Sequence, residues 1–520
     1  MSSITTACML LHLLLLQAPA EPKTADDVMQ RVRQATQFSK EKIPDTGLQF
    51  TGEGTFAGLP AHYILLFNRN GHFVQTTNAR ITTGSGFDGT NVWIKDLGGE
   101  QRIQELADRN NTIVNGLFAT SLWLDPGSGM RYTLEEGQPK DGIYLLHFKH
   151  HPTEITGSIQ IDAKTWLPVQ STMKAEGQKV TNKWSGIMEF NGIKFPKTHH
   201  SLSGNDGVET YTIESIQAAP TFVRSPYAPL VTPPSDVTFN DKLPAELEVM
   251  RAKTGHLLVK PKVNGKDVGW FIFDSGAGAT CLDTRLIKEL ELEQFGEVPA
   301  IGVGGTVKTR FSKPDTISLG RATFKDPVVI GLDLAFLSGP MGAKIAGVIG
   351  YGVFHRCIVE LDMEKNTIAL FDPKTYDQSR VQNRWQKLYQ TARVACVEAE
   401  FEGHKGVFKL DTGAAGSTVA LHAPTVEKFK LLVGRETTET SAGGVGGNVT
   451  AMSGKLKYFE LGGHRTDDIE ATFATTTKGA FNSADTLGNI GGDLLKPFKI
   501  VFDYQDKRIA FVKRENEVPK

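Results

Sequence analysis

The sequence predicts a mostly β protein in which a helix-plus-antiparallel-sheet domain precedes two copies of one β-barrel lobe, paired as a pseudo-two-fold bilobed unit. Three observations predict this fold class. Short segments rich in β-branched and aromatic residues alternate with Gly, Asn, Asp and Pro along most of the chain. A cluster of prolines interrupts the pattern near the middle. Beyond that cluster, one series of motifs occurs twice, at offsets of 137 to 142 residues.

The composition describes an ordinary globular protein. The chain has 520 residues, with 57 Lys and Arg against 58 Asp and Glu, and a formal net charge of −1. At about 150 residues per domain, this length corresponds to roughly three to four domains. Hydrophobic residues make up 40% and charged residues 22%, which argues against a disordered chain. Without a basic excess or a basic stripe, no binding to nucleic acid is expected.

The first 20 residues have the pattern of a secretory signal peptide. An apolar run over residues 8–16 precedes Ala18-Pro19-Ala20, which fits cleavage after Ala20 and export to the periplasm or the outside of the cell. No Lys or Arg precedes the run, so an apolar N-terminal helix stays an alternative. The run is too short to cross a bilayer, and no later segment is long and apolar enough, so no transmembrane segment is expected.

Cysteine usage indicates buried thiols rather than a disulfide framework. Cys8 lies within the expected signal peptide, which leaves Cys281, Cys357 and Cys396 in the mature chain. Three cysteines cannot all pair within one chain, and four in 520 residues are far fewer than a disulfide scaffold contains.

Residues 21–217 are expected to form the N-terminal α+β sheet domain. Helical spacing of Val28, Val32, Ala35 and Phe38 predicts a helix over 25–40, and a second helical stretch lies near 109–121. Strands are expected over 61–68, 72–77, 92–95, 143–149, 157–161 and 208–216. The pairs Asn70-Gly71 and Asp88-Gly89 are typical of hairpin turns.

A proline-rich linker is expected over residues 218–240. Five prolines between 218 and 236 favour an extended segment over a packed element. The five are Pro220, Pro226, Pro229, Pro233 and Pro234. We place the first lobe at 241–378 and the second at 379–520.

Four landmarks recur in the same order in the two lobes. The paired segments are 270–277 and 407–414, 302–305 and 444–447, 347–350 and 488–491, and 360–371 and 501–512. A repeat of this length is too long for a solenoid and indicates a duplicated domain, with a short insertion in the second copy.

Each copy places an Asp at the end of an apolar segment, followed by Ser or Thr, Gly and Ala. A carboxylate at such a place is costly unless it is hydrogen-bonded or functional. A neighbouring hydroxyl can donate to the carboxylate, and glycine lets backbone N–H groups approach it. We therefore expect Asp274 and Asp411 to be catalytic. The expected carboxylate-orienting residues are Ser275, Gly276, Thr412 and Gly413.

A pseudo-two-fold axis would bring Asp274 and Asp411 together. Two carboxylates about 3 Å apart cannot both ionise, so the pair shares one proton. Such a pair can activate a water for attack on an amide carbonyl and can protonate the departing group. A pair that has lost catalysis is the alternative.

The two copies resemble retropepsin-like aspartic proteases of the pepsin and retropepsin superfamily. Residues 410–414, Leu-Asp-Thr-Gly-Ala, match the retropepsin motif, and Phe-Asp-Ser-Gly-Ala at 273–277 is a looser match. The resemblance covers about 246–513, with an apolar-Gly motif at 348–352 and 489–493. It implies two substrate-binding flaps, formed by Gly302, Val303, Gly304, Gly305, Gly444, Val445, Gly446 and Gly447. Neither flap has the tyrosine of pepsins, and Asn489 replaces an apolar residue.

The N-terminal segment is similar to lipoprotein-carrier half-barrels of bacterial envelopes. The similarity lies in its helix-then-sheet order and in the segments 86–93 and 161–167. It implies a curved sheet that binds an acyl chain or acts as a scaffold.

The function expected from these features is that of an aspartic endopeptidase acting on an extended peptide or protein, as a monomer, without metal or cofactor. The alternative is a non-catalytic envelope protein that binds peptide or lipid and carries a degenerate protease fold. A third possibility is that each copy dimerises in trans. The N-terminal domain could be an inhibitory pro-region or a permanent partner, and the sequence leaves this open.

Overall fold

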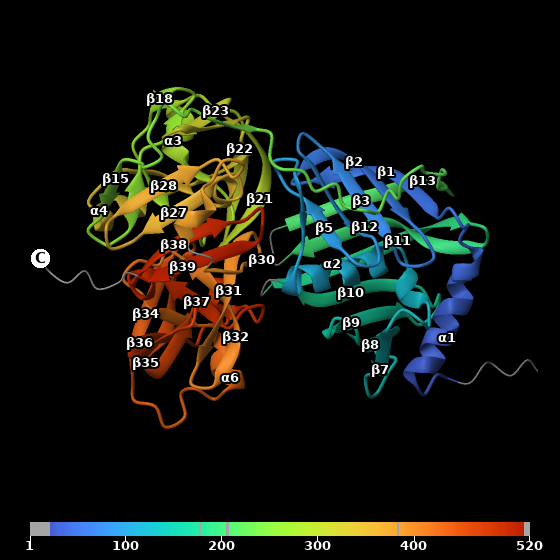
Figure 1. The fold of residues 1–520 in the computed structure, drawn as a ribbon. Helices are drawn as coiled ribbons and strands as arrows, with labels where there is room; N and C mark the ends of the chain where they lie inside the picture. Colours follow the sequence, from blue (N-terminus) through green and yellow to red (C-terminus); the bar gives the residue numbers. More distant parts are fainter. Residues whose placement is uncertain (1–20, 176–177, 204–206, 382–383, 514–520) are drawn as a thin grey trace, which may run out of the picture.

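The computed structural model describes residues 21–175, 178–203, 207–381 and 384–513. The expected signal peptide lies outside these residues. The chain is mostly β, which confirms the expected fold class. In Figure 1 the N-terminal domain, in blue to green, lies beside the two C-terminal lobes, in yellow-green to red. No helix among the described residues is long and apolar enough to cross a membrane.

The N-terminal domain is built on one antiparallel sheet of 13 strands, in the order β6-β5-β4-β3-β2-β1-β13-β12-β11-β10-β9-β8-β7. The first and last strands of the domain pair in the middle of the sheet, and each half continues outward by hairpins. The strands are β1 Leu48–Phe56, β2 Leu59–Phe67, β3 Phe73–Asn78, β4 Thr82–Phe87, β5 Val92–Lys95, β6 Gln101–Ile103, β7 Met130–Leu134, β8 Ile143–His150, β9 Ile155–Asp162, β10 Pro168–Ala175, β11 Gln178–Phe190, β12 Ile193–Ser203 and β13 Gly207–Ala218. The two expected Gly turns join β2 to β3 and β4 to β5.

Two helices, with short 3₁₀ turns, pack on this sheet. Helix α1 (Ala25–Thr36) begins with a capping box between Thr24 and Asp27 and ends earlier than expected, because Gln37 adopts a left-handed conformation. Helix α2 (Leu106–Ala119) contacts β4 and β5 from one half of the sheet and β9 and β10 from the other, so the sheet curves around it. The 3₁₀ turns are η1 Lys40–Lys42 and η2 Leu122–Leu124.

The proline-rich segment is more closely packed than the sequence indicates. Tyr227 is buried, and its carbonyl accepts a hydrogen bond of 2.8 Å from the Trp93 indole of the N-terminal domain. Strand β14 (Val237–Phe239) already pairs with β24 of the first lobe, although the linker was expected to reach residue 240. The linker is therefore shorter than expected, because Tyr227 is buried against the N-terminal domain and β14 pairs with β24.

The two lobes have sheets with the same strand order. The first is β15-β16-β19-β26-β20-β25-β22-β21, and the second is β30-β31-β32-β37-β33-β36-β35-β34. Each strand of the first sheet therefore has a counterpart in the second, as the repeated motifs predict. The first lobe has a second sheet, β14-β24-β23-β17-β18, where the second lobe instead has longer strands.

The elements of the first lobe are β15 Val249–Arg251, β16 Leu257–Val259, β17 Lys262–Val263, β18 Lys266–Asp267, β19 Trp270–Phe273, β20 Cys281–Asp283, α3 Thr284–Glu289, β21 Gln294–Gly302, β22 Gly305–Ser312, β23 Thr316–Leu319, β24 Ala322–Lys325, β25 Val329–Leu332, α4 Ala335–Met341, β26 Ile345–Ile349, α5 Tyr351–Phe354, β27 Ile358–Asp362, β28 Thr367–Phe371 and η3 Gln378–Val381. The elements of the second lobe are β29 Trp385–Lys387, β30 Tyr389–Thr391, β31 Val394–Phe401, β32 His404–Asp411, β33 Val419–Leu421, α6 Ala423–Lys428, β34 Thr437–Gly444, β35 Gly447–Leu461, β36 His464–Ala474, η4 Ala480–Asn482, β37 Gly488–Gly491, α7 Gly492–Leu495, β38 Phe498–Asp503 and β39 Arg508–Lys513.

Strands of both lobes form one sheet between them, in the order β28-β27-β38-β39-β29. At its centre β27 pairs antiparallel with β38, and Glu360 lies opposite Val501. These two residues are equivalent in the repeat, so a pseudo-two-fold axis passes between the strands.

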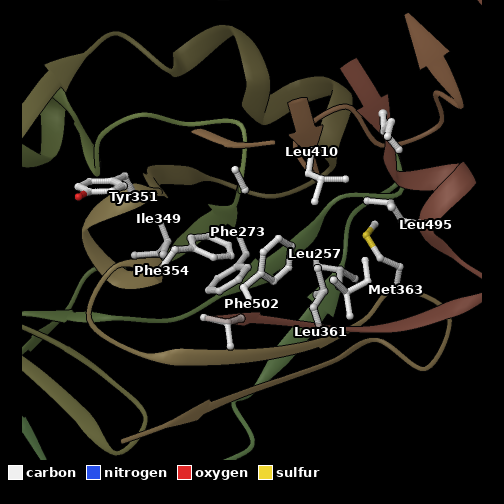
Figure 2. Close-up of a cluster of buried hydrophobic side chains, with 14 of the residues drawn as sticks. Leu257, Phe273, Ile349, Tyr351, Phe354, Leu361, Met363, Leu410, Leu495 and Phe502 are labelled. Carbon is white, nitrogen blue, oxygen red and sulfur yellow. The ribbon is translucent and has the colours of Figure 1, made fainter. Parts of the chain in front are cut away.

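One apolar core extends through both lobes. Phe273 and Leu410, the residues directly before the two aspartates, are both buried in it. Figure 2 shows them beside Leu257, Phe354 and Phe502, which come from both lobes. The ends of the two strands that carry the aspartates are thus held by the same packed core.

Candidate active site

The two aspartates lie at equivalent ends of equivalent strands. Asp274 directly follows β19, and its N–H donates to the Ile349 carbonyl at 2.9 Å. Asp411 is the last residue of β32 and lies opposite Gly491 of β37. Each aspartate therefore projects from a loop that is pinned by a parallel neighbour, the segment of the expected apolar-Gly motif.

Ser275 and Thr412 lock the two loops to each other. Ser275 Oγ donates to the carbonyl of Leu410 at 2.8 Å, and Thr412 Oγ1 donates to the carbonyl of Phe273 at 3.0 Å. The backbone N–H groups complete the exchange, Ser275 to Thr412 Oγ1 at 2.9 Å and Thr412 to Ser275 Oγ at 3.2 Å. Both side chains are at most 2% exposed.

This arrangement corrects the expected role of the two hydroxyls. They do not donate to the carboxylates, because each is buried against a backbone carbonyl of the opposite loop, which needs a donor. Ser275 and Thr412 therefore join the two loops through their backbone.

The two carboxyl groups face each other across glycine backbone. Gly276 N–H and Gly413 N–H both donate to Asp274 Oδ1, at 2.7 and 3.1 Å. A methyl group on Gly276 would lie 2.6 Å from Asp411 Oδ1 and 3.1 Å from Asp274 Oδ1. A methyl group on Gly413 would lie 2.4 Å from Asp274 Cγ. Only glycine leaves room for the pair at either position.

Burial raises the pKa values of both carboxyl groups, and the charge of Asp411 adds to the rise at Asp274. Burial, with the neighbouring charge of Asp411, raises the pKa of Asp274 to about 7. Burial also raises the pKa of Asp411, while a hydrogen bond from Asn489 and the charge of Lys409 oppose that rise. Two carboxyl groups this close titrate as a pair, so over part of the pH range one of them is protonated while the other is ionised.

Two further side chains reach the loop of Asp411. Asn489 Nδ2 donates to Asp411 Oδ2 at 2.9 Å, and His256 Nε2 lies 2.8 Å from the carbonyl oxygen of Gly413. Sequence reasoning did not assign either residue to the site. The signal for Asn489 was an amide in one copy where the other has a valine.

The two expected flaps are hairpins whose tips meet. Gly302–Gly305 closes β21 onto β22, and Gly444–Gly447 closes β34 onto β35. Gly304 N–H donates to the carbonyl of Val445 at 3.0 Å. A methyl group on Gly304 would lie 2.3 Å from the backbone of Gly446. The structure thus brings all eight expected flap residues together around one contact between lobes.

The N-terminal domain contacts the first lobe at a residue that bonds to the loop of Asp274. Tyr351 N–H donates to the Ala277 carbonyl in the loop of Asp274, and its hydroxyl donates to Asp96 Oδ2 of the N-terminal domain at 2.7 Å. Arg356 pairs with Glu100 at 2.5 Å and with Asp236 at 2.6 Å, and it is 8% exposed. The buried Arg356 thus joins the first lobe to the N-terminal domain, while Glu100 and Asp236 stay partly exposed.

A second contact of the N-terminal domain reaches the loop of Asp274 through the second lobe. Asp108 of α2 accepts hydrogen bonds from Thr391 Oγ1 at 2.9 Å and from Ala392 N–H at 3.0 Å. The carbonyl of Ala392 lies so close to Gly278 that a methyl group there would approach it to 2.7 Å. The N-terminal domain therefore supports the turn that packs on the loop of Asp274.

The three cysteines within the described residues are free and buried. Burial raises the pKa of Cys281, near Asp274, to about 12, so its thiol is not poised as a nucleophile.

Comparison with known proteins relates both lobes to aspartyl proteases. Residues 259–353 and 397–493 each match the aspartyl protease family model, and each segment contains one of the two aspartates. A retropepsin-like aspartic protease from Rickettsia conorii is 21% identical with a TM-score of 0.19, over 24% of this chain and 86% of that chain. A LolA superfamily protein from Nitrosomonas europaea is 11% identical with a TM-score of 0.28, over 38% of this chain and 97% of that chain. Comparison with curated proteins gives no significant match.

Proposed function

We propose that this protein is an aspartic endopeptidase in which Asp274 and Asp411 of one chain form a single catalytic dyad. The observation that carries the proposal is the meeting of the two carboxyl groups between Gly276 and Gly413, at the junction of two equivalent lobes. The family-model matches to both lobes support the same reaction class.

The chemistry follows from one shared proton. The ionised carboxyl takes a proton from a water between the two groups as the water oxygen bonds to the peptide carbonyl carbon. The protonated carboxyl gives its proton to the carbonyl oxygen. Collapse of the tetrahedral intermediate then breaks the C–N bond. The amine leaves with a proton from one carboxyl, while the other carboxyl takes a proton from a hydroxyl of the intermediate, so the dyad again holds one proton. The sum is one water added across one peptide bond, without a covalent intermediate.

The substrate in this proposal is an extended peptide that lies beneath the two flaps. The flap hairpins carry glycine at their tips, so backbone N–H and C=O groups can bond to a peptide laid beneath them as an added strand. Because both halves of the dyad and both flaps belong to one chain, the active form would be a monomer. We also propose export of the protein, on the apolar run and the Ala18-Pro19-Ala20 sequence.

The test is hydrolysis of an unfolded protein substrate across a range of pH. Asp411→Asn and Asp274→Asn keep the shape of the side chain but remove the shared proton, and each is expected to abolish cleavage. Cleavage by either variant at the rate of the unmodified protein would reject the dyad.

We propose a second binding function for the N-terminal domain: an apolar ligand of acyl-chain type. A cavity of about 400 Å³ lies between η2 and strands β10 to β12, lined by residues that include Trp123, Leu124, Trp184 and Phe195. A volume of this size with aromatic walls suits an apolar chain. Quenching of tryptophan fluorescence by a long-chain fatty acid should show binding, and Trp184→Ala should weaken it. Equal quenching of both proteins would contradict this site.

A further inference from the structure

The dyad is asymmetric at one pair of equivalent positions. In the first lobe, Val348 lies opposite Ile272, two residues before Asp274. In the second lobe, Asn489 lies opposite Lys409, two residues before Asp411. The repeat thus has a valine at one position and an amide at the equivalent position of the other lobe.

The amide of Asn489 connects Asp411 to a buried histidine. Its Nδ2 donates to Asp411 Oδ2 at 2.9 Å, and its Oδ1 lies 2.9 Å from His422 Nε2. His422 precedes helix α6 and is fully buried. Its Nδ1 lies 3.2 Å from the carbonyl oxygens of Ser483 and Thr486 and 3.5 Å from Thr486 Oγ1.

The acceptors set the direction of these hydrogen bonds. With the amide oriented so that Nδ2 donates to Asp411, Asn489 Oδ1 can only accept, so His422 Nε2 carries a hydrogen. A neutral ring can accept from the hydroxyl of Thr486 at Nδ1, and a charged ring can donate to the two carbonyls. In either case, two successive donors point toward Asp411 Oδ2, and each bond polarises the next.

Other charges act on the two carboxyl groups without repeating this arrangement. Lys409 and His256 lower the pKa of Asp411, while Asp411 itself raises that of Asp274. Cys281 and Tyr504, whose own pKa values are raised by burial and by Asp274, are the other titratable groups nearby. Burial lowers the pKa of His422 to about 4, with Lys409 acting in the same direction.

We propose that His422 and Asn489 are positioning residues that make the two carboxyls unequal. They hold Asp411 as the ionised group that takes the proton from water, and they leave Asp274 with the proton that the dyad donates. This inference rests on the proposed function and adds an assignment of roles within it.

The first test is the pH dependence of kcat/KM for Asn489→Val, which gives the second lobe the residue of the first. Loss of a donor to a carboxylate should raise the pKa of Asp411 and move the acidic limb of the profile upward by about one to two pH units. His422→Leu should move it in the same direction by less. His422→Gln keeps an N–H donor and should restore the profile of the unmodified protein.

The matched control is Asn482→Val, at the end of the 3₁₀ turn η4, in the loop whose Ser483 carbonyl lies near His422. Asn482 donates to the carbonyl of Thr477 and does not contact the dyad or His422. A role for Asn489 in folding alone would lower the activity of Asn489→Val but leave its pH profile unshifted, as in the control. An unshifted kcat/KM profile in Asn489→Val would overturn the proposal. A shift to lower pH would also overturn it, because that shift means that a protonated Asp411 donates to Asn489.

A readout without turnover separates this inference from the proposed function. Titration of the aspartate carboxyl carbons by NMR, with the dyad signals assigned by their loss in Asp274→Asn and Asp411→Asn, measures the same pKa values directly. The titration of Asp411 should move upward in Asn489→Val. If the unmodified protein cleaves no substrate, the proposed function fails, but this titration still decides whether the pair of positioning residues acts on Asp411.

Discussion

Replacement of Thr412 by valine should loosen the junction of the two lobes. The side chains have nearly the same shape, so the change removes one hydroxyl and little else. That hydroxyl donates to the carbonyl of Phe273 at 3.0 Å and accepts from Ser275 N–H at 2.9 Å. Both backbone partners are buried and lose their hydrogen bond.

The magnitude follows from these two groups. Each buried polar group left without a partner costs about 1–3 kcal/mol, so Thr412→Val should lower the free energy of unfolding by about 2–6 kcal/mol. Ser275→Ala removes the equivalent bonds on the other side. The double variant should cost less than the sum of the two single variants, since both changes break one network.

Urea unfolding and peptide cleavage measure the two consequences. The control is Thr133→Val on strand β7, an exposed site where the same chemical change should alter stability by less than about 0.5 kcal/mol. Activity should fall along with stability in Thr412→Val, because the loop exchange positions both carboxyls. A variant as stable and as active as the control would refute the reasoning.

Three further changes test other parts of the structure. The folded-state pKa of Asp274 is raised, so its contribution to stability is complete below about pH 4 and is lost as pH rises through about 7. Over this range the free energy of unfolding should fall by up to about 1.4 kcal/mol per pH unit. Asp274→Asn should remove this pH dependence. Gly304→Ala should lower kcat/KM, because the added methyl would lie 2.3 Å from the opposite flap, while Gly339→Ala in α4, which has open space, should not. Tyr351→Phe removes the hydroxyl that binds Asp96 and should lower thermal stability and kcat together; unchanged values of both would show that the N-terminal domain does not support the catalytic loop.

The paired architecture of the C-terminal half could be predicted because the sequence repeats its landmarks. Residues 270–277 and 407–414 each combine an apolar segment with Asp, a hydroxyl residue and glycine. Equivalent segments in a duplicated fold take equivalent places, so the strand order of the two sheets and the meeting of Asp274 with Asp411 both follow.

Contacts between distant residues could not be predicted, since they depend on which acceptor lies within reach. The hydroxyl of Ser275 binds a carbonyl 135 residues away rather than the carboxylate beside it. In the sequence, Asn489 is only a departure from an apolar pattern, and no pattern links it to His422. Likewise, the contact of Tyr351 with Asp96 joins two domains across 255 residues.

In the proposed enzyme, one chain contains one active site built by both copies. Calorimetric titration of the purified protein with a statine-containing peptide, which mimics the tetrahedral intermediate, tests it most directly. We expect one inhibitor bound per 520-residue chain, and loss of tight binding in both Asp274→Asn and Asp411→Asn. Two inhibitors per chain, one per two chains, or tight binding retained in either variant would contradict it.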